Sequence, residues 1–90
     1  MAEDNTVFIG RKSTMAYVMA VIMQINKGNT DITLKARGKA ISRAVDVAEI
    51  VRNKFVNEIK VDDIKIFTEE IKGDQDNDLK VSAIEIYLKK

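Results

Sequence analysis

The chain has 90 residues, of which 46% are hydrophobic and 32% charged, a composition typical of one folded domain with a modest core. It contains neither cysteine nor histidine, which excludes disulfides, thiolate nucleophiles and imidazole bases. The formal net charge of +1 hides a division along the chain. Residues 35–60 carry seven cations and three acids, whereas residues 62–78 carry two cations and seven acids. This asymmetry is a reason to consider a polyanionic partner.

The beginning of the chain predicts a strand followed by a helix. Residues 7–9 form a short apolar run that ends at a glycine, which is typical of a strand. Ser13 or Thr14 is then suited to cap a helix, because its side-chain oxygen accepts a hydrogen bond from a free backbone N–H. Apolar residues recur on most sides of this helix, and Gly28 is the expected stop.

The middle of the chain predicts a second strand and a second helix. Residues 31–36 alternate apolar and polar side chains, as a half-buried strand does. Gly38 is expected to turn the chain with a positive φ. A helix is predicted over residues 39–55, with its buried stripe formed by Ile41, Ala44, Ala48, Val51 and Phe55, widened by Val45, Val47 and Ile50.

The rest of the chain predicts a long hairpin. Residues 61–71 and 79–88 are rich in strand-forming residues, and the connection "KGDQDND" between them contains no apolar residue. The element order is therefore β-α-β-α-β-β, which gives an α/β domain of two layers over residues 1–90.

The sequence offers little for an enzyme, a cofactor or a metal. Neither of the two common glycine-rich phosphate loops is present. Asp74, Asp76 and Asp78 resemble the alternating ligands of a calcium loop, but Leu79 stands where that loop needs its glycine, and Glu85, at the position of the closing glutamate, falls in a predicted strand. We therefore expect no catalytic activity, no cofactor and no metal.

A polyanion site has more support. Arg11 and Lys12 precede the first helix, and Lys35, Arg37 and Lys39 run along the polar side of the second strand into the second helix. If both helices pack on one side of the sheet, these clusters meet at the same end of the molecule and can bind phosphates. The alternative is that 15 cations on a small domain cluster without a function.

Three segments together resemble the Alba family of archaeal chromatin proteins: "FIGRKSTMAYVMAVI", "KARGKAISRAVDVAEIVRNKF" and the closing "VSAIEIYLKK". The resemblance covers essentially the whole chain. It implies a fold similar to the C-terminal domain of bacterial translation initiation factor three. It also implies a homodimer that coats double-stranded DNA with little sequence preference, while relatives bind RNA.

The resemblance implies roles for particular residues. The nucleic-acid contacts of the family fall on Arg11, Lys12, Lys35, Arg37, Lys39, Arg43, Asn53 and Lys54. Phe55 matches the aromatic residue that joins one dimer to the next. Taken alone, the helical stripe favours core packing for Phe55.

Two departures from the family pattern affect the prediction. Arg11 stands where some members carry an acetylated lysine, so charge is kept but that regulation is not expected. The hairpin of strong DNA binders is basic, whereas here it presents Asp74, Asp76 and Asp78. Carboxylates repel phosphates and release no counterions, so we expect weak, strongly salt-dependent binding through the body of the dimer.

Other side chains have plainer expectations. Met15, Met19 and Met23 form a row that predicts core or dimer packing, and Tyr17 is expected to be packed. Arg43 and Arg52 are expected to pair with Asp46 or Glu49, and such exposed pairs, worth about 0–1 kcal/mol, would not prevent contact with DNA. Because the sequence shows no surface platform of aromatic residues, binding of duplex is favoured over stacking of single strands.

These observations predict a homodimeric, non-enzymatic protein that binds double-stranded DNA in the cytoplasm, on the chromosome. RNA binding in ribonucleoprotein assembly or RNA chaperoning is the first alternative, and a dimeric protein scaffold is the second. The apolar run 15–23 is too short to span a bilayer, so no membrane association is expected.

Overall fold

A computed structural model describes residues 5–72 and 78–90. Its elements follow the predicted order β-α-β-α-β-β. They are β1 (Thr6–Phe8), α1 (Thr14–Asn26), β2 (Asp31–Arg37), a 3₁₀ turn η1 (Gly38–Ala40), α2 (Ile41–Ile50), a π turn η2 (Val51–Phe55), β3 (Lys60–Lys72) and β4 (Asp78–Lys89). The predicted single helix over residues 39–55 is thus one continuous rod made of three helical types.

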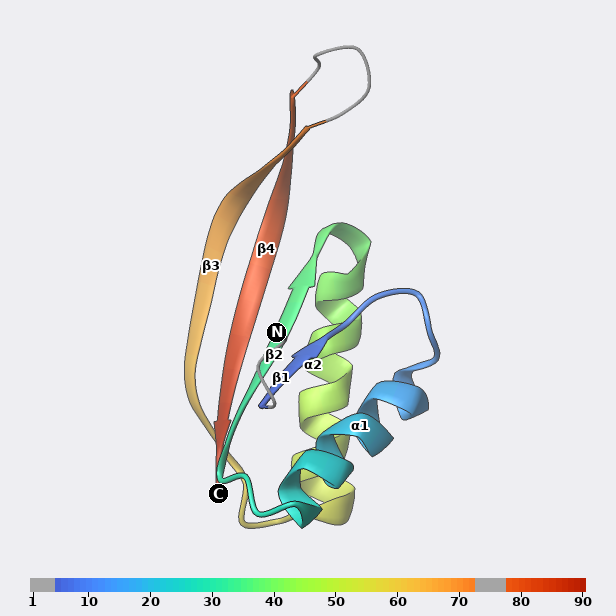
Figure 1. The fold of residues 1–90 in the computed structure, drawn as a ribbon, viewed down its shortest axis with the longest axis vertical. Coiled ribbons are helices and arrows are strands. Elements are labelled where there is room, and N and C mark those ends of the chain that lie inside the picture. Colours follow the sequence, from blue (N-terminus) through green and yellow to red (C-terminus); the bar gives the residue numbers. More distant parts are fainter. Residues whose placement is uncertain (1–4, 73–77) are drawn as a thin grey trace.

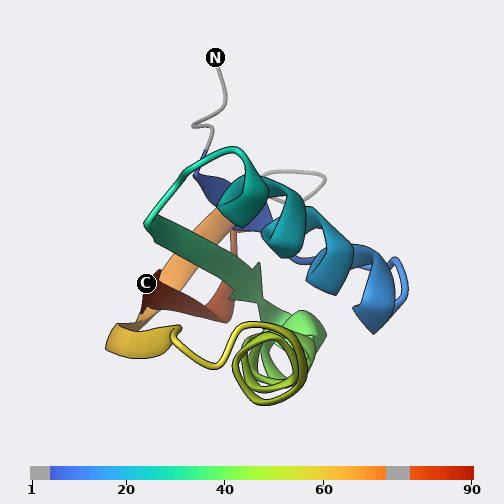
Figure 2. The same cartoon turned by 90° about the horizontal axis from the view of Figure 1, so that it is seen from below.

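The four strands form one sheet in the order β1-β2-β4-β3. β1 and β2 are parallel, and β4 is antiparallel to both β2 and β3. The two helices lie together on one face of the sheet (Figure 2), where α1 contacts β1 and β2 and α2 contacts β2 and β4. The paired strands β3 and β4 extend well past the body as an arm (Figure 1). This arrangement confirms the predicted two-layer α/β fold.

Both predicted boundaries of the first helix are confirmed. The Ser13 hydroxyl oxygen accepts a hydrogen bond from the Ala16 N–H at 3.2 Å, which satisfies one of the free donors of the first turn. At the other end, Lys27 closes the helix and Gly28 has a φ of +99°, which a side chain would disfavour. Gly38 likewise has the positive φ that the sequence predicted, at +60°.

The core lies between the sheet and the two helices. The inward residues of β2 are buried as the alternation predicted, α2 buries Ala44, Val47 and Ala48, and η2 buries Val51. The prediction of burial is wrong for Phe55, whose side chain is 49% exposed. The cause is the π turn: Val56 donates to the Val51 carbonyl five residues back, which shifts the last residues out of the helical stripe.

The methionine row and Val45 also differ from the expectation. Met15, Met19 and Met23 are largely exposed, because α1 turns its other side, with Val18 and Val21, toward the sheet. Core packing of these methionines within one chain is therefore wrong. Val45 is exposed as well, because it lies on the flank of α2 beside the buried Ala44. In residues 5–72 and 78–90, none of the helices has the length and apolar character needed to cross a membrane.

Candidate nucleic-acid interface

A groove of about 960 Å³ lies where the ends of β1 and β2 meet the start of α2 and the open face of the sheet. Seven of its lining residues are charged: Arg11, Lys35, Arg37, Lys39, Arg43, Glu69 and Glu85. The five cations exceed the two carboxylates by a net charge of +3. We call this feature the basic groove.

Parallel pairing explains why distant parts of the sequence meet here. β1 and β2 run side by side in the same direction, so both chains leave the sheet at the same edge. Arg11 follows β1, and Lys39 follows β2. The prediction that the two basic clusters lie near each other is therefore confirmed, with Lys12 exposed beside Arg11.

The loop that carries Arg11 and Lys12 is held by a tyrosine. The Tyr17 hydroxyl oxygen accepts hydrogen bonds from the backbone N–H of Gly10 at 2.9 Å and of Lys12 at 3.0 Å. The Tyr17 side chain is buried, as predicted, but its bonds to the loop were not foreseen. A Cβ at Gly10 would lie 3.3 Å from the Tyr17 hydroxyl, so the glycine allows this close approach.

Arg43 holds the same loop from the second helix. Its guanidinium Nη1 donates a hydrogen bond to the Gly10 carbonyl oxygen. The expected pairing of Arg43 with Asp46 or Glu49 is therefore not what the structure shows. The expectation was correct for Arg52, whose guanidinium lies 2.9 Å from a Glu49 carboxylate oxygen. Sequence spacing identifies pairs within one helix, but it cannot show a contact between residues 33 positions apart.

Two ion pairs join groove cations on β2 to carboxylates on β3 and β4. Lys35 Nζ lies 3.7 Å from a Glu85 oxygen, and Arg37 Nη1 lies 3.9 Å from a Glu69 oxygen. Pairs at such distances near the surface are worth about 0–1 kcal/mol, so a phosphate can displace them. The Tyr87 hydroxyl also donates to Glu85, and this bond raises the pKa of Tyr87 to about 12.

Two exposed aromatic rings line the basic groove, contrary to the sequence expectation. Phe8 is 62% exposed and Phe67 is 41% exposed. Phe8 faces outward because its neighbours, Val7 on β1 and Ile9 just after it, are buried in the core. The Lys35 ammonium lies 5.8 Å from the centre of the Phe8 ring. The three-residue alternation was too short to show from sequence which side would be buried.

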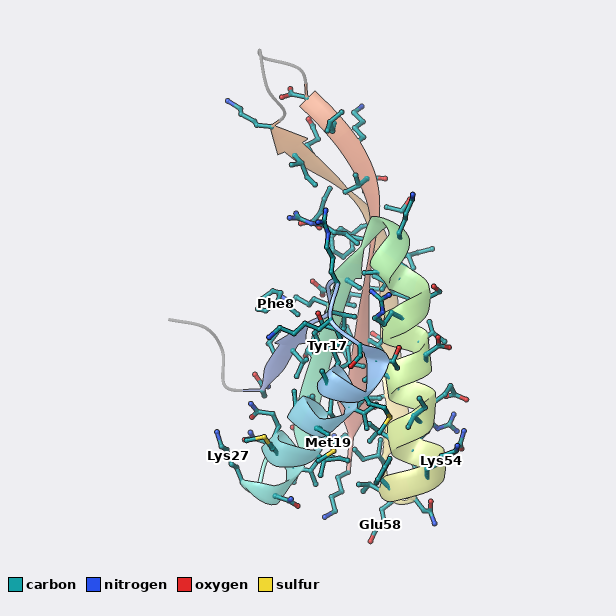
Figure 3. All side chains as sticks on the ribbon, turned by 90° about the vertical axis from the view of Figure 1, so that its right-hand side faces the viewer. Phe8, Tyr17, Met19, Lys27, Lys54 and Glu58 are labelled. Atoms are coloured by element: carbon teal, nitrogen blue, oxygen red, sulfur yellow. The ribbon has the colours of Figure 1, made fainter. Side chains whose placement is uncertain are left out.

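Asn53, Lys54 and Phe55 lie apart from the basic groove. All three are exposed, and they end the helical rod whose start carries Lys39. A rise of 1.5 Å per residue puts Lys39 and Lys54 roughly 20 Å apart along the axis. Figure 3 shows Lys54 beside Glu58 at the lower end of the molecule, whereas Phe8 and Tyr17 lie higher.

The acidic hairpin is only partly within the described structure. Asp74 and Asp76 lie outside the described residues, whereas Asp78 is exposed and opens β4 opposite Lys72. Across residues 5–72 and 78–90, no group of three or more acidic side chains is placed to hold a metal ion.

The comparisons with known proteins identify the family. The family model described as Alba matches residues 5–68. The chain belongs to the Alba family. It is 58% identical to "DNA/RNA-binding protein Alba 1" of Archaeoglobus fulgidus, over 97% of each chain. It is 49% identical to "DNA/RNA-binding protein Alba" of Methanocella arvoryzae, over its whole length and 94% of that protein.

Solved structures of Alba proteins share the fold. The structure of Alba from Thermoplasma volcanium superposes with a TM-score of 0.91 at 48% identity, over 96% of this chain and all of that one. Alba1 from Trypanosoma brucei superposes with a TM-score of 0.82 at 24% identity, over all of this chain and 72% of that one, and supports the fold alone.

Proposed function

We propose that this Alba-family protein is a non-enzymatic, chromosome-associated protein that binds double-stranded DNA through phosphate contacts from the basic groove. The observation that carries the proposal is the convergence of five cations from three parts of the chain on one surface. Lysine and arginine side chains neutralise phosphates and release condensed counterions, which drives binding with little dependence on sequence. The relatives named as DNA/RNA-binding proteins support a nucleic-acid partner.

The protein acts as a homodimer in this proposal. β3 is an edge strand, and its helix-side residues Ile64 and Ile66 are exposed although their partners on β4 are buried. Ile66 is 79% exposed, and neither helix of the described chain covers it. A second copy would bury these isoleucines and set two basic grooves side by side, which doubles the number of phosphate contacts.

The acidic hairpin weakens binding in this proposal. The described part of the arm beyond Phe67 carries Glu69, Glu70, Lys72, Asp78 and Lys80, so its charges are mixed. Such an arm adds few counterion-releasing contacts to those of the groove. Replacing Asp74, Asp76 and Asp78 together by lysine should therefore raise duplex affinity. Unchanged affinity would show that the arm does not face phosphates.

The decisive experiment measures duplex affinity at several salt concentrations. We expect the double variant Arg11→Ala/Lys12→Ala to bind more weakly and to reduce the salt slope by about one to two per subunit, because each phosphate contact contributes roughly 0.9. The matched control is Lys27→Ala/Lys60→Ala, which removes two exposed cations that do not line the groove. An unchanged slope in the first variant, or an equal loss in the control, contradicts the assignment.

RNA is the alternative partner, favoured by the double description of the relatives as DNA/RNA-binding. The groove cations recognise phosphates, which both nucleic acids carry. A competition titration between duplex DNA and a structured RNA of equal length measures the preference directly. Displacement of DNA by a tenfold lower concentration of RNA would make RNA the main partner.

A further inference from the structure

We propose that the basic groove also binds unpaired nucleotides, whose bases stack on the exposed rings of Phe8 and Phe67. This inference rests on the proposed nucleic-acid function and goes beyond it by assigning two residues of the same site to the recognition of unpaired bases. It depends on two aromatic side chains and on their position relative to the cations.

Phe8 has no packing role that would explain its size. Its ring is 62% exposed, while its two neighbours in sequence, Val7 and Ile9, are buried in the core. It pairs with Lys35 on the open face of the sheet, and the Lys35 ammonium lies 5.8 Å from the ring centre. Figure 3 shows Phe8 projecting outward at the end of β1. A phosphate held by Lys35 would therefore bring its base close to an exposed aromatic face.

Phe67 lies on the same open face, on the far edge of the sheet. Its pairing partner is Ala83 on β4, which in turn pairs with Arg37 on β2. The row therefore places a ring, a small residue and a guanidinium side by side. Since neighbouring strands lie about 4.8 Å apart, the strands that carry Phe8 and Phe67 are separated by roughly 14 Å. The two rings thus flank the groove, and the cations lie between and beside them.

This combination favours single strands over duplex for a physical reason. In a duplex the faces of the bases are covered by their neighbours, so protein rings reach only edges and phosphates. Unpaired bases expose both faces, and stacking on an aromatic side chain is worth about 1–3 kcal/mol per base. A positive groove that follows the backbone, with rings for the bases, is the usual arrangement of single-strand sites.

The charge of the groove argues against an apolar protein segment as the occupant. A hydrophobic peptide on Phe8 and Phe67 would cover the five groove cations without pairing them, and burying unpaired charge is costly. A single strand matches both the cations and the rings, because each nucleotide carries one phosphate and one base. The ion pairs of Lys35 and Arg37 are long, at 3.7 and 3.9 Å, so these cations can exchange their carboxylate partners for phosphates.

The first test varies the nucleic acid and leaves the protein unchanged. Affinity is measured for a single-stranded oligothymidine and for an abasic strand with the same number of phosphates. We expect the abasic strand to bind about fivefold or more weakly, because it keeps the charges and lacks the stacking bases. Equal affinity would overturn the stacking proposal.

The second test varies the rings. Phe8→Leu and Phe67→Leu should each weaken binding of oligothymidine about fivefold or more and weaken duplex binding clearly less, because only unpaired bases stack on the rings. Met19→Leu is the control, because Met19 is similarly exposed but lies on α1 outside the groove. Since the chain has no tryptophan, Phe8→Trp introduces one tryptophan at the groove. Oligothymidine should quench the fluorescence of this tryptophan, and duplex should not.

The outcomes separate the two proposals. If the protein binds duplex with a strong salt dependence but neither ring variant nor base removal alters single-strand affinity, the stacking proposal fails and the proposed function stands. If the protein binds neither duplex nor single strands, both proposals fail. If the leucine variants weaken duplex and single-strand binding by the same factor, the rings only maintain the shape of the groove, and the stacking proposal is also overturned.

Discussion

The two ends of the second helical rod differ in what they present. At its start, Lys39 and Arg43 join cations from two other segments around a groove. At its end, Asn53, Lys54 and Phe55 are exposed and lie roughly 20 Å away along the axis. The start is therefore a composite surface built by tertiary contacts, whereas the end is a local surface built by one turn.

A continuous sequence motif can therefore contribute to two separate surfaces. The segment from Lys35 to Phe55 is contiguous in sequence, and the family resemblance implies nucleic-acid contacts near both of its ends. Within one chain, however, the residues of this segment that line the basic groove all lie between Lys35 and Arg43. The end of the rod needs a second copy, a neighbouring dimer or a long nucleic acid before it can act with the groove.

Removing the cations of β2 together with Lys39 at the start of the rod should affect duplex binding most. Lys35→Ala/Arg37→Ala/Lys39→Ala should lower duplex affinity about a hundredfold or more, since each charged hydrogen bond contributes about 1.5–3 kcal/mol. The salt slope should fall by about 2–3 per subunit, because three phosphate contacts are lost. Titrations of a short duplex at several salt concentrations measure both quantities.

Lys54→Ala is the comparison variant, because it removes an exposed cation from the other end of the same rod. We expect its slope to fall by at most about one, for a single contact. If this one substitution weakens binding as much as the triple variant does, the end of the rod is the main contact surface and the contrast between the two ends is wrong.

A second prediction concerns the tyrosine that holds the basic loop. Tyr17→Phe removes the oxygen that accepts from Gly10 and Lys12, and each of these partly buried hydrogen bonds contributes about 0.5–1.5 kcal/mol. We expect lower stability in denaturant and a roughly five- to tenfold loss of duplex affinity, since less of the loop population is then in the bound conformation. The salt slope should stay unchanged, because every cation remains.

Tyr87→Phe provides the control, because it removes the other tyrosine hydroxyl without touching the loop. Arg43 also holds Gly10, so part of the loop structure should survive in Tyr17→Phe. A loss of stability with unchanged affinity would mean that Arg43 alone orders the loop. An altered slope would mean that the hydroxyl acts on phosphate directly.

Much of the fold could be predicted from the sequence because its signals are local. The alternation in β2, the cap at Ser13 and the glycines at positions 28 and 38 depend on neighbouring residues, and the structure confirms each. The error at Phe55 has a local cause that the pattern could not show. A helical stripe assumes a constant register, and the π turn changes it.

The site could be predicted only in part, because some of its contacts follow from the order of elements and others from how the helices pack. The convergence of Arg11 with Lys39 follows from two parallel strands, which the order of elements already implies. The contacts of Tyr17 and Arg43 with the loop depend on how α1 and α2 pack, and no spacing rule gives that packing. The exposed ring of Phe8 was missed because a three-residue strand has too few alternations to assign its faces.

A third, smaller effect is expected at the far end of the rod. Phe55→Ala should lower the free energy of unfolding by about 1 kcal/mol, because about half of the ring is buried. If Phe55 joins neighbouring dimers, the variant should coat a long duplex less cooperatively while it binds a short duplex normally. Equal cooperativity on long duplex would remove Phe55 from the assembly, and weaker binding to short duplex would place it in the primary interface.

The last and smallest effect concerns the pKa of Tyr87, whose hydrogen-bond partner Glu85 also pairs with Lys35. Tyr87 donates to Glu85, which raises the pKa of Tyr87 from 10.0 to about 12. Because the folded-state value lies above the unfolded value, this bond stabilises the protein fully below about pH 10 and is lost as the pH rises through about 12. Absorbance titration of tyrosinate in Tyr17→Phe, which keeps Tyr87 alone, should show this late transition.

Glu85→Gln is the matched change, because it keeps the shape of the side chain and removes its charge. The pKa of Tyr87 should then fall back toward 10.0, since both the hydrogen bond to a carboxylate and the nearby negative charge are lost. The same variant leaves Lys35 without its carboxylate partner, so duplex affinity should rise slightly. If affinity falls instead, Glu85 orients Lys35 toward the phosphate, and the ion pair belongs to the bound state of the groove.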